Sequence, residues 1–212
     1  MGKGLFITFE GGEGSGKSTQ IKRLAASLEA DGRTVLQTRE PGGSPGAEAI
    51  RALLVTGDPE RWDGMTEALL HYAARRDHVE RTIKPALNAG KIVLCDRFSD
   101  STMAYQGYGH GLGRDAITRI HSVTLGSFKP DLTLILDLPV EEGLKRAAGR
   151  GGDERRYEDM DVAFHERLRA GFMEIAEAES GRCRVIDASG SEVEVAARLN
   201  EAVTPVLKST NA

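Results

Sequence analysis

The sequence predicts an α/β fold in which a parallel five-stranded sheet carries helices on both of its faces. Short, nearly continuous apolar runs alternate with segments of helical periodicity along all 212 residues. Such runs are typical of strands that are buried on both sides, as in a parallel sheet. Glycine-rich or charged segments interrupt the chain after several of these runs. The length suits one domain, residues 1–212, with at most a small mobile insert.

The first predicted strand, residues 5–9, is followed by a glycine-rich loop and then by a helix. Residues 11–18 read Gly-Gly-Glu-Gly-Ser-Gly-Lys-Ser and fit the pattern G-x-x-x-x-G-K-[ST], and apolar residues recur at helical spacing from Ile21 to Leu28. In such a loop, backbone N–H groups and the positive end of the helix bind phosphates, the lysine reaches the outer phosphates and the serine ligates Mg²⁺. We therefore expect a P-loop NTPase-type fold; the alternative, a Gly-rich surface turn, does not account for the flanking strand and helix.

The remaining elements continue the alternation in chain order. Further strands are predicted at residues 34–38, 92–95, 132–138 and 183–186, and further helices at residues 47–55, 65–88, 114–125, 140–148, 160–179 and 192–207. Polar residues follow the second strand at Arg39 and the third at Asp96 and Arg97. Because ligands collect at the carboxyl ends of parallel strands, we expect these residues at the site. Glycines and charges at residues 149–158 predict a small lid, with a disordered charged loop as the alternative.

Composition narrows the class of protein. The net charge of −4 and the isoelectric point near 5.8 argue against a nucleic-acid-coating surface. No apolar run approaches the length of a membrane span, and the N-terminus has no cleavable apolar segment, so we expect a cytoplasmic protein without a membrane partner. Cys95 and Cys183 lie far apart, each in or beside an apolar run, which favours buried core thiols over a metal site or a disulfide.

The other polar segments restrict the phosphate chemistry. A signalling GTPase needs a base-reading N-K-x-D segment, which the sequence does not contain. A mechanical ATPase usually takes an arginine from a neighbour, whereas this chain has several arginines of its own after strands and in its predicted lid. Since the planar guanidinium grips two phosphate oxygens at once, these arginines suit a second phosphate besides those of ATP.

Four segments resemble the thymidylate kinase family of the bacterial kind, in matching order and spacing along nearly the whole chain. They are residues 9–20 with the glycine-rich loop, residues 38–43 (Thr-Arg-Glu-Pro-Gly-Gly), residues 96–107 with Asp-Arg-Phe and Ala-Tyr-Gln-Gly, and residues 130–133 (Pro-Asp-Leu-Thr). Other nucleoside monophosphate kinases share the loop without the second and third segments. The resemblance implies transfer of the γ-phosphoryl group of ATP to dTMP, which gives dTDP and ADP for dTTP biosynthesis. It also implies a homodimer built by helix packing beside the sheet.

For the donor nucleotide, the resemblance implies that the loop binds the phosphates of ATP with Mg²⁺. Ser18 would ligate the metal, and Asp96 would act on it through bound water. Arg97 would hold the 5′-phosphate of dTMP. The alternative for Lys17 is a solvated lysine at the start of the helix. The alternative for Asp96 and Arg97 is a structural ion pair. The expected cofactor-binding residues are Gly11, Gly12, Glu13, Gly14, Ser15, Gly16, Lys17, Ser18 and Thr19.

For the acceptor, the resemblance implies that Glu13 faces the sugar and binds its 3′-hydroxyl, and that Tyr105 crowds the ribose 2′ position. Thr102 and Gln106 would read the base edge, and Arg75 would contact the thymine or the acceptor side. His71 departs from the family, which more often has a phenylalanine that stacks on the thymine. The imidazole could make base affinity weaker or pH-dependent, or it could keep the same stacking role as the phenylalanine. The expected substrate-binding residues are Glu13, Arg39, His71, Arg75, Arg97, Ser101, Thr102, Tyr105 and Gln106.

The loop itself carries no arginine, so the resemblance implies that the lid supplies the catalytic one. Arg156 best matches the family's Arg-x-Glu, followed by Arg150, with Arg155 nearby. The expected catalytic residues are Lys17, Asp96, Arg97, Arg150 and Arg156. Two other functions stay open at this point: a kinase for another monophosphate such as dUMP, and a P-loop switch that hydrolyses nucleotide slowly to control a partner.

Overall fold

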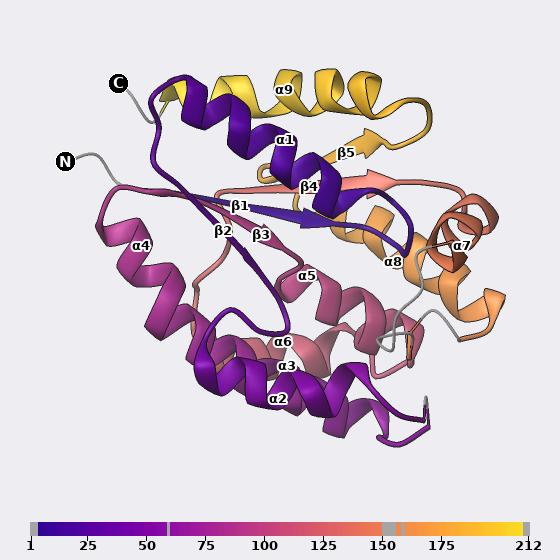
Figure 1. The fold of residues 1–212 in the computed structure, drawn as a ribbon. Coiled ribbons are helices and arrows are strands. Elements are labelled where there is room, and N and C mark those ends of the chain that lie inside the picture. Colours follow the sequence, from indigo (N-terminus) through magenta and orange to yellow (C-terminus); the bar gives the residue numbers. More distant parts are fainter. Residues whose placement is uncertain (1–3, 59, 150–155, 158–159, 210–212) are drawn as a thin grey trace.

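The computed structural model describes residues 4–58, 60–149, 156–157 and 160–209, and the described strands form one parallel sheet (Figure 1). The strand order is β2-β3-β1-β4-β5, with β1 in the centre. The prediction of an α/β fold with a parallel five-stranded sheet is confirmed, and each strand lies within one residue of its predicted bounds. The strands are β1 (Leu5–Glu10), β2 (Val35–Arg39), β3 (Ile92–Asp96), β4 (Leu132–Asp137) and β5 (Cys183–Asp187).

The helices also follow the predicted order, with one region that the sequence pattern missed. The sequence pattern predicted no element at residues 99–109, but they form a short helix and a π-helical segment, α5 and η2, whose residues are mostly buried polar or small and carry no apolar period. The predicted helix at residues 65–88 is divided by the π-helical turn η1. The helical elements are α1 (Lys17–Ala30), α2 (Pro45–Val55), α3 (Gly64–His78), η1 (Val79–Ile83), α4 (Lys84–Asn88), α5 (Ser99–Thr102), η2 (Met103–Gly109), α6 (Arg114–Leu125), α7 (Val140–Ala148), α8 (Val162–Ala178) and α9 (Glu192–Ser209).

Alternate residues of each strand point to opposite faces, and each face has its own apolar layer. Leu5, Ile7 and Phe9 of β1 pack with the inward faces of α1 and α9. Phe6 of β1 packs on the other side with α3, η1 and α6, and Ile135 of β4 packs there with α8. Figure 1 shows α1 and α9 above the sheet and the remaining large helices below it. The prediction of helices on both faces is therefore confirmed.

The sheet register brings the predicted polar residues to one edge. Phe9 of β1 pairs with Asp96 of β3, and Asp96 pairs in turn with Arg39 of β2. The glycine-rich loop leaves β1 at this same edge, so the loop and the residues after β2 and β3 share one site.

Two further expectations concern the cysteines and the membrane. Cys95 and Cys183 are free, buried thiols in the apolar layers, as predicted. Burial raises the pKa of both thiols, so neither ionises near neutral pH. Within the described part of the chain, no helix combines the length and apolar character that a membrane span needs.

Candidate active site

The loop at residues 11–18 has a backbone that only glycine supplies easily. Gly14 and Gly16 have φ values of 69° and 87°, in the left-handed region that L side chains rarely adopt. A Cβ atom at Gly14 would also overlap the carbonyl oxygen of Gly143 in α7. Gly16 is the residue that precedes the first turn of α1. The loop thus packs closely against α7 and leads directly into the first turn of α1, as an anion-binding loop does.

Lys17 lies along the inside of this loop. Its Nζ donates hydrogen bonds to the carbonyl oxygens of Gly11 and Gly12, at 3.1 and 2.9 Å, and to Ser15 Oγ at 3.2 Å. Burial, with the positive charge of Arg97 nearby, lowers the pKa of Lys17 to about 8. The loop therefore holds this cation at an electrostatic cost, which a phosphate placed beside it would offset.

Ser18 and Asp96 meet at the end of β3. Ser18 Oγ donates a hydrogen bond of 2.8 Å to Asp96 Oδ2. A hydroxyl and a carboxylate are the hard oxygen ligands that Mg²⁺ prefers, and Mg²⁺ keeps several waters and often takes phosphate oxygens as well. The described residues contain no group of three or more His, Cys, Asp or Glu side chains placed to hold a metal. The pair therefore fits a magnesium ion that arrives with nucleotide phosphates.

Arg97 joins this loop to the segment that follows β3. Its backbone has φ 67°, which is uncommon for a non-glycine residue, and its N–H donates to Phe9 O at 2.9 Å. Its guanidinium donates to Glu13 Oε1 at 2.8 Å, to Gly11 O at 3.1 Å and to Ser101 Oγ at 3.2 Å. A cation thus stands between the glycine-rich loop and α5.

Glu13 is the carboxylate partner of Arg97. Tyr105 also donates to its Oε1, at 2.6 Å. Burial alone would raise the pKa of Glu13, but Arg97 and Lys17 outweigh burial and bring it down to about 2. Glu13 is therefore ionised, with its backbone in the loop and its side chain directed to Arg97 and Tyr105.

A cavity of about 200 Å³ opens beside Glu13 and Arg97. All predicted substrate-binding residues except Arg75 line it, so residues from distant segments are brought together. They are joined there by Glu40, Pro41, Arg51, Val55, Asp96 and Tyr157. Arg39, at the outer side, is exposed and pairs with Glu48 at 3.3 Å.

Arg75 lies just beneath this cavity. Its Nε donates to Glu40 Oε2 at 2.6 Å, and its Nη2 donates to Phe98 O and Thr102 Oγ1, each at 3.0 Å. The side chain is buried, and within the described structure its Nη1 atom has no hydrogen-bond partner. Because a buried donor seeks an acceptor, Nη1 is available to a ligand that reaches it.

The family follows from a sequence comparison. The family model described as thymidylate kinase matches residues 9–199. The chain belongs to the thymidylate kinase family.

Individual thymidylate kinases resemble the chain along nearly its whole length. It is 58% identical over 203 residues to the thymidylate kinase of Caulobacter vibrioides, which covers 96% of this chain and 97% of the relative. It is 52% identical over 209 residues to that of Ruegeria pomeroyi, with 99% of each chain covered. The crystal structure of thymidylate kinase from Ehrlichia chaffeensis matches with a TM-score of 0.78 and 35% identity, over 95% of this chain and 99% of that chain. The predicted P-loop NTPase fold and the predicted family are both confirmed.

In this member of the thymidylate kinase family, His71 lies in the wall of the cavity. Its Nε2 is 3.0 Å from the hydroxyl of Tyr157, and the two ring centroids are 6.4 Å apart. Burial, aided by the positive charge of Arg75, lowers the pKa of His71 to about 3. The imidazole is therefore neutral at physiological pH, and its own titration cannot make base affinity vary there.

The predicted lid arginines are placed only in part. Arg150 and Arg155 lie outside the described residues, and so does most of the predicted lid. Arg156 is buried: its guanidinium forms an ion pair with Glu67 of α3 and donates to the carbonyl oxygens of Leu54 and Asp58. For Arg156 to reach a phosphoryl group at the loop, this ion pair would have to open.

Glu67 is a residue that the sequence analysis missed. It is fully buried, and its Oε2 accepts from Gln106 Nε2 at 3.0 Å and lies 3.3 Å from His110 Nε2. It therefore connects Gln106, which lines the cavity, with His110 and Arg156. Glu67 stands inside the predicted helix at residues 65–88, where a carboxylate is most often solvated, so periodicity alone gave no signal for it.

Glu10 and Asp100 were also missed. Both carboxylates are buried next to the Arg97 segment, where Glu10 Oε1 accepts from Phe98 N at 2.7 Å. The sequence does hold a signal for Glu10, because a lone carboxylate at the end of an otherwise apolar strand needs a buried donor. Asp100 carries no comparable local signal, since its partner Arg182 is far away in the chain.

Proposed function

We propose that the protein transfers the γ-phosphoryl group of ATP to dTMP and so produces dTDP and ADP for dTTP biosynthesis. The observation that carries this proposal is the position of Glu13. It belongs to the phosphate-binding loop by its backbone and to the acceptor cavity by its side chain, where it pairs with Arg97 and Tyr105. A donor site and an acceptor site thus meet at one residue, which is the geometry that direct transfer between two nucleotides requires.

In the proposed reaction, a 5′-phosphate oxygen of dTMP attacks the γ-phosphorus of ATP, and the bond to the β–γ bridging oxygen breaks, which releases ADP. Residues 11–18 and Lys17 bind the phosphates of ATP. Ser18 would ligate Mg²⁺ and Asp96 would act on it through bound water, and the bound ion would supply positive charge to the phosphate oxygens. Arg97 orients the 5′-phosphate of dTMP. Since two anions must approach, alignment and charge neutralisation are the protein's main tasks.

Side chains of the cavity account for the choice of acceptor. Glu13 accepts a hydrogen bond from the 3′-hydroxyl of the sugar, and Tyr105 occupies the space that a 2′-hydroxyl would need. Thr102, Gln106 and Arg75 meet the polar edge of the base, for which the buried Nη1 atom of Arg75 is a donor. His71 stacks on the thymine as a neutral ring.

The catalytic arginine is proposed to come from the predicted lid, at residues 149–158. Arg156 is the first candidate and Arg150 the second. In the catalytic complex Arg156 would exchange Glu67 for the transferred phosphoryl group, where an arginine is worth roughly a thousandfold in turnover.

We also propose a homodimer in the cytoplasm. Leu53, Met65, Leu69 and Val123 are exposed apolar side chains on α2, α3 and α6, which lie together on one side of the molecule (Figure 1). Burying such residues between two copies would remove them from water. Two free cysteines agree with a reducing compartment. Light scattering of the parent and of Leu69→Glu tests the dimer: we expect the parent at twice the monomer mass and the variant at lower mass.

A coupled assay of ADP release tests the reaction. We expect release that requires dTMP, with ribothymidine 5′-monophosphate a poor acceptor because of Tyr105. One methyl group is worth only about 1–3 kcal/mol, so dUMP should be a slower acceptor, not an inert one. ADP release that does not depend on any monophosphate would instead favour a slow nucleotide-hydrolysing switch and would overturn the proposal.

A further inference from the structure

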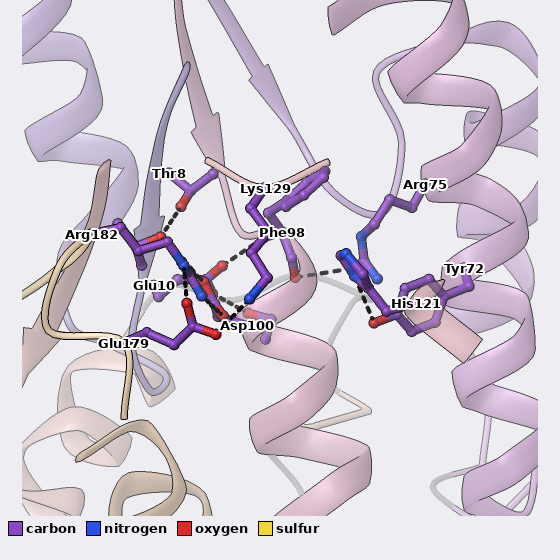
Figure 2. Close-up of polar contacts among 12 residues, drawn as sticks. Thr8, Glu10, Tyr72, Arg75, Phe98, Asp100, His121, Lys129, Glu179 and Arg182 are labelled. Carbon is purple, nitrogen blue, oxygen red and sulfur yellow. Dashed lines mark hydrogen bonds and ion pairs between the residues drawn. The ribbon is translucent and has the colours of Figure 1, made fainter. Parts of the chain in front are cut away.

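A set of buried or mostly buried polar side chains lies close to the acceptor cavity without lining it. Figure 2 shows their polar contacts. The set links the central strand β1, the short helix α5, the strand β4 and the turn before β5. Hydrogen bonds join Thr8, Asp100, Thr133 and Arg182, and the buried carboxylate of Glu10 lies close enough to Asp100 to be affected by its charge. Polar groups buried in this number need a structural or functional reason, because each is costly when its partners are imperfect.

Glu10 contacts the segment that carries Arg97 in two places. Its Oε1 accepts from the backbone N–H of Phe98 at 2.7 Å, and its Oε2 accepts from Ser101 Oγ at 2.5 Å. The carbonyl oxygen of Phe98 accepts a hydrogen bond from Arg75 Nη2 at 3.0 Å. The polar groups of Phe98 are thus held at both ends by buried, charged side chains (Figure 2).

These contacts bear directly on the backbone of Arg97. A non-glycine residue with φ 67° is strained by on the order of 1 kcal/mol or more, so it persists only where its surroundings fix it. Phe9 O holds the N–H of Arg97, and Glu10 holds the next N–H along the chain, that of Phe98. Ser101, which Glu10 also holds, accepts from the Arg97 guanidinium at 3.2 Å.

Asp100 and Arg182 anchor the same short helix from below. Arg182 donates from two nitrogen atoms to the two oxygens of Asp100, each at 2.7 Å, a bidentate geometry that also fixes orientation. Thr133 Oγ1 accepts from Arg182 at 2.7 Å and is 2.9 Å from Thr8 Oγ1. Since Asp100 precedes Ser101, this pair fixes the helix from which Ser101 projects.

We infer that Glu10 is a positioning residue for Arg97: through Phe98 N–H and Ser101 it holds Arg97 in the left-handed conformation that directs its guanidinium into the acceptor site, while Asp100 and Arg182 hold α5 in place. This inference rests on the proposed phosphorylation of dTMP. Burial and the nearby charge of Asp100 raise the pKa of Glu10 to about 7. Glu10 is therefore kept in an unfavourable environment, which its contacts with the Arg97 segment explain.

Steady-state kinetics of Glu10→Leu and Glu10→Gln test this role. Leucine removes both contacts, and we expect the KM for dTMP to rise about tenfold or more, as for the loss of buried hydrogen bonds, with the KM for ATP changed less than about threefold. Glutamine can still accept from Phe98 N–H and donate to Ser101 Oγ, so it should restore the KM for dTMP to within about threefold of the parent.

Leu199→Ala is the matched control, because Leu199 is buried on the opposite face of the sheet, in the layer of α1 and α9. It should lower thermal stability and leave both KM values at the parental level. A parental KM for dTMP in Glu10→Leu, or an equal rise in both KM values, would overturn the inference. A parent protein without dTMP-dependent ADP release would instead overturn the proposed function.

Asp100→Asn provides an independent test and carries it alone if Glu10→Leu does not fold. Asparagine keeps the shape of aspartate and loses its charge, so the grip on Arg182 weakens. We expect the KM for dTMP to rise about fivefold with the KM for ATP changed less than about threefold, since one charge-assisted contact is weakened but not removed. A parental KM for dTMP in a folded Asp100→Asn protein would contradict the inferred role of the α5 anchor.

Discussion

The donor loop and the acceptor cavity are built in opposite ways. The loop is one run of eight residues, 11–18, in which Lys17 donates hydrogen bonds to its near neighbours Gly11, Gly12 and Ser15. The cavity is assembled from distant segments, and buried charges next to these segments are balanced in pairs such as Arg75–Glu40 and Arg156–Glu67. A site made of contiguous backbone is fixed by local conformation, whereas a site made of distant side chains depends on each buried charge keeping its partner.

Substitution of Arg156 is the strongest test of the contrast between the donor loop and the acceptor cavity. The structure places Arg156 in a buried ion pair, whereas the proposed mechanism brings it to the transferred phosphoryl group. We expect Arg156→Ala to lower turnover roughly a thousandfold, more than it weakens dTMP binding. We also expect it to lower the free energy of unfolding by about 3–5 kcal/mol, because Glu67 is left buried without its guanidinium. Turnover and denaturant unfolding measure the two effects.

The double variant Arg156→Gln/Glu67→Gln separates them. Neutral amides should recover most of the stability, since neither residue then leaves an unpaired buried charge. Turnover should stay low if the guanidinium acts on the phosphoryl group. Parental turnover in the stable double variant would make Arg156 a structural residue and transfer the catalytic role to Arg150 or Arg155.

Substitution of Lys17 tests whether the donor loop keeps its conformation without this side chain. We expect Lys17→Ala to lower turnover by about a hundredfold to a thousandfold, the usual effect of removing one preorganised group that stabilises the transition state. Thermal stability should change little, because burial already disfavours the charged form of this lysine. Lys22→Ala, an exposed position of the same helix, is the control and should keep parental kinetics. A large loss of stability in Lys17→Ala would mean that the loop depends on this side chain.

Arg97 stands between the two regions, and two substitutions separate its backbone from its side chain. Arg97→Ala and Arg97→Gly both remove the guanidinium, so each should raise the KM for dTMP about tenfold to a hundredfold, with turnover less affected. Glycine accepts φ 67° without strain, so Arg97→Gly should be more stable than Arg97→Ala by about 1 kcal/mol. Kinetics and thermal unfolding of the pair check this. Equal stability would show that the left-handed backbone carries no strain.

His71 gives the smallest expected effect, on the pH dependence of the acceptor side. With its pKa lowered to about 3, His71 is neutral from pH 6 to 9, so the KM profiles of the parent and His71→Phe should run parallel within about threefold. Below pH 6 the unfolded chain binds a proton at His71 that the folded chain refuses, so parental stability should fall more steeply than that of His71→Phe. A titration near pH 6.5 that disappears in His71→Phe would contradict this.

The contrast between loop and cavity also explains how far the sequence could be used to predict the structure. Strands, the glycine-rich loop and most helices follow from local patterns, and the resemblance of four segments indicates which residues surround the acceptor. Eight predicted substrate-binding residues line the cavity, together with the predicted Asp96, and Arg75 lies just beneath it. Glu67 and Arg182 could not be predicted in the same way, because the need for a buried countercharge arises only once the fold brings their partners to them.

The order of strands in the sheet has a consequence for engineering this protein. β1 is central, with β3 on one side and β4 on the other, so the chain builds one half of the sheet before it starts the second. Among the described residues, nearly all that line the cavity fall between positions 39 and 106, within that first half, and Glu13 and Tyr157 come from elsewhere. A contiguous stretch from β2 to α6 therefore carries most of the acceptor cavity, and an exchange of this stretch between homologues would transplant these residues together, provided that Asp96, the partner of Ser18, is retained.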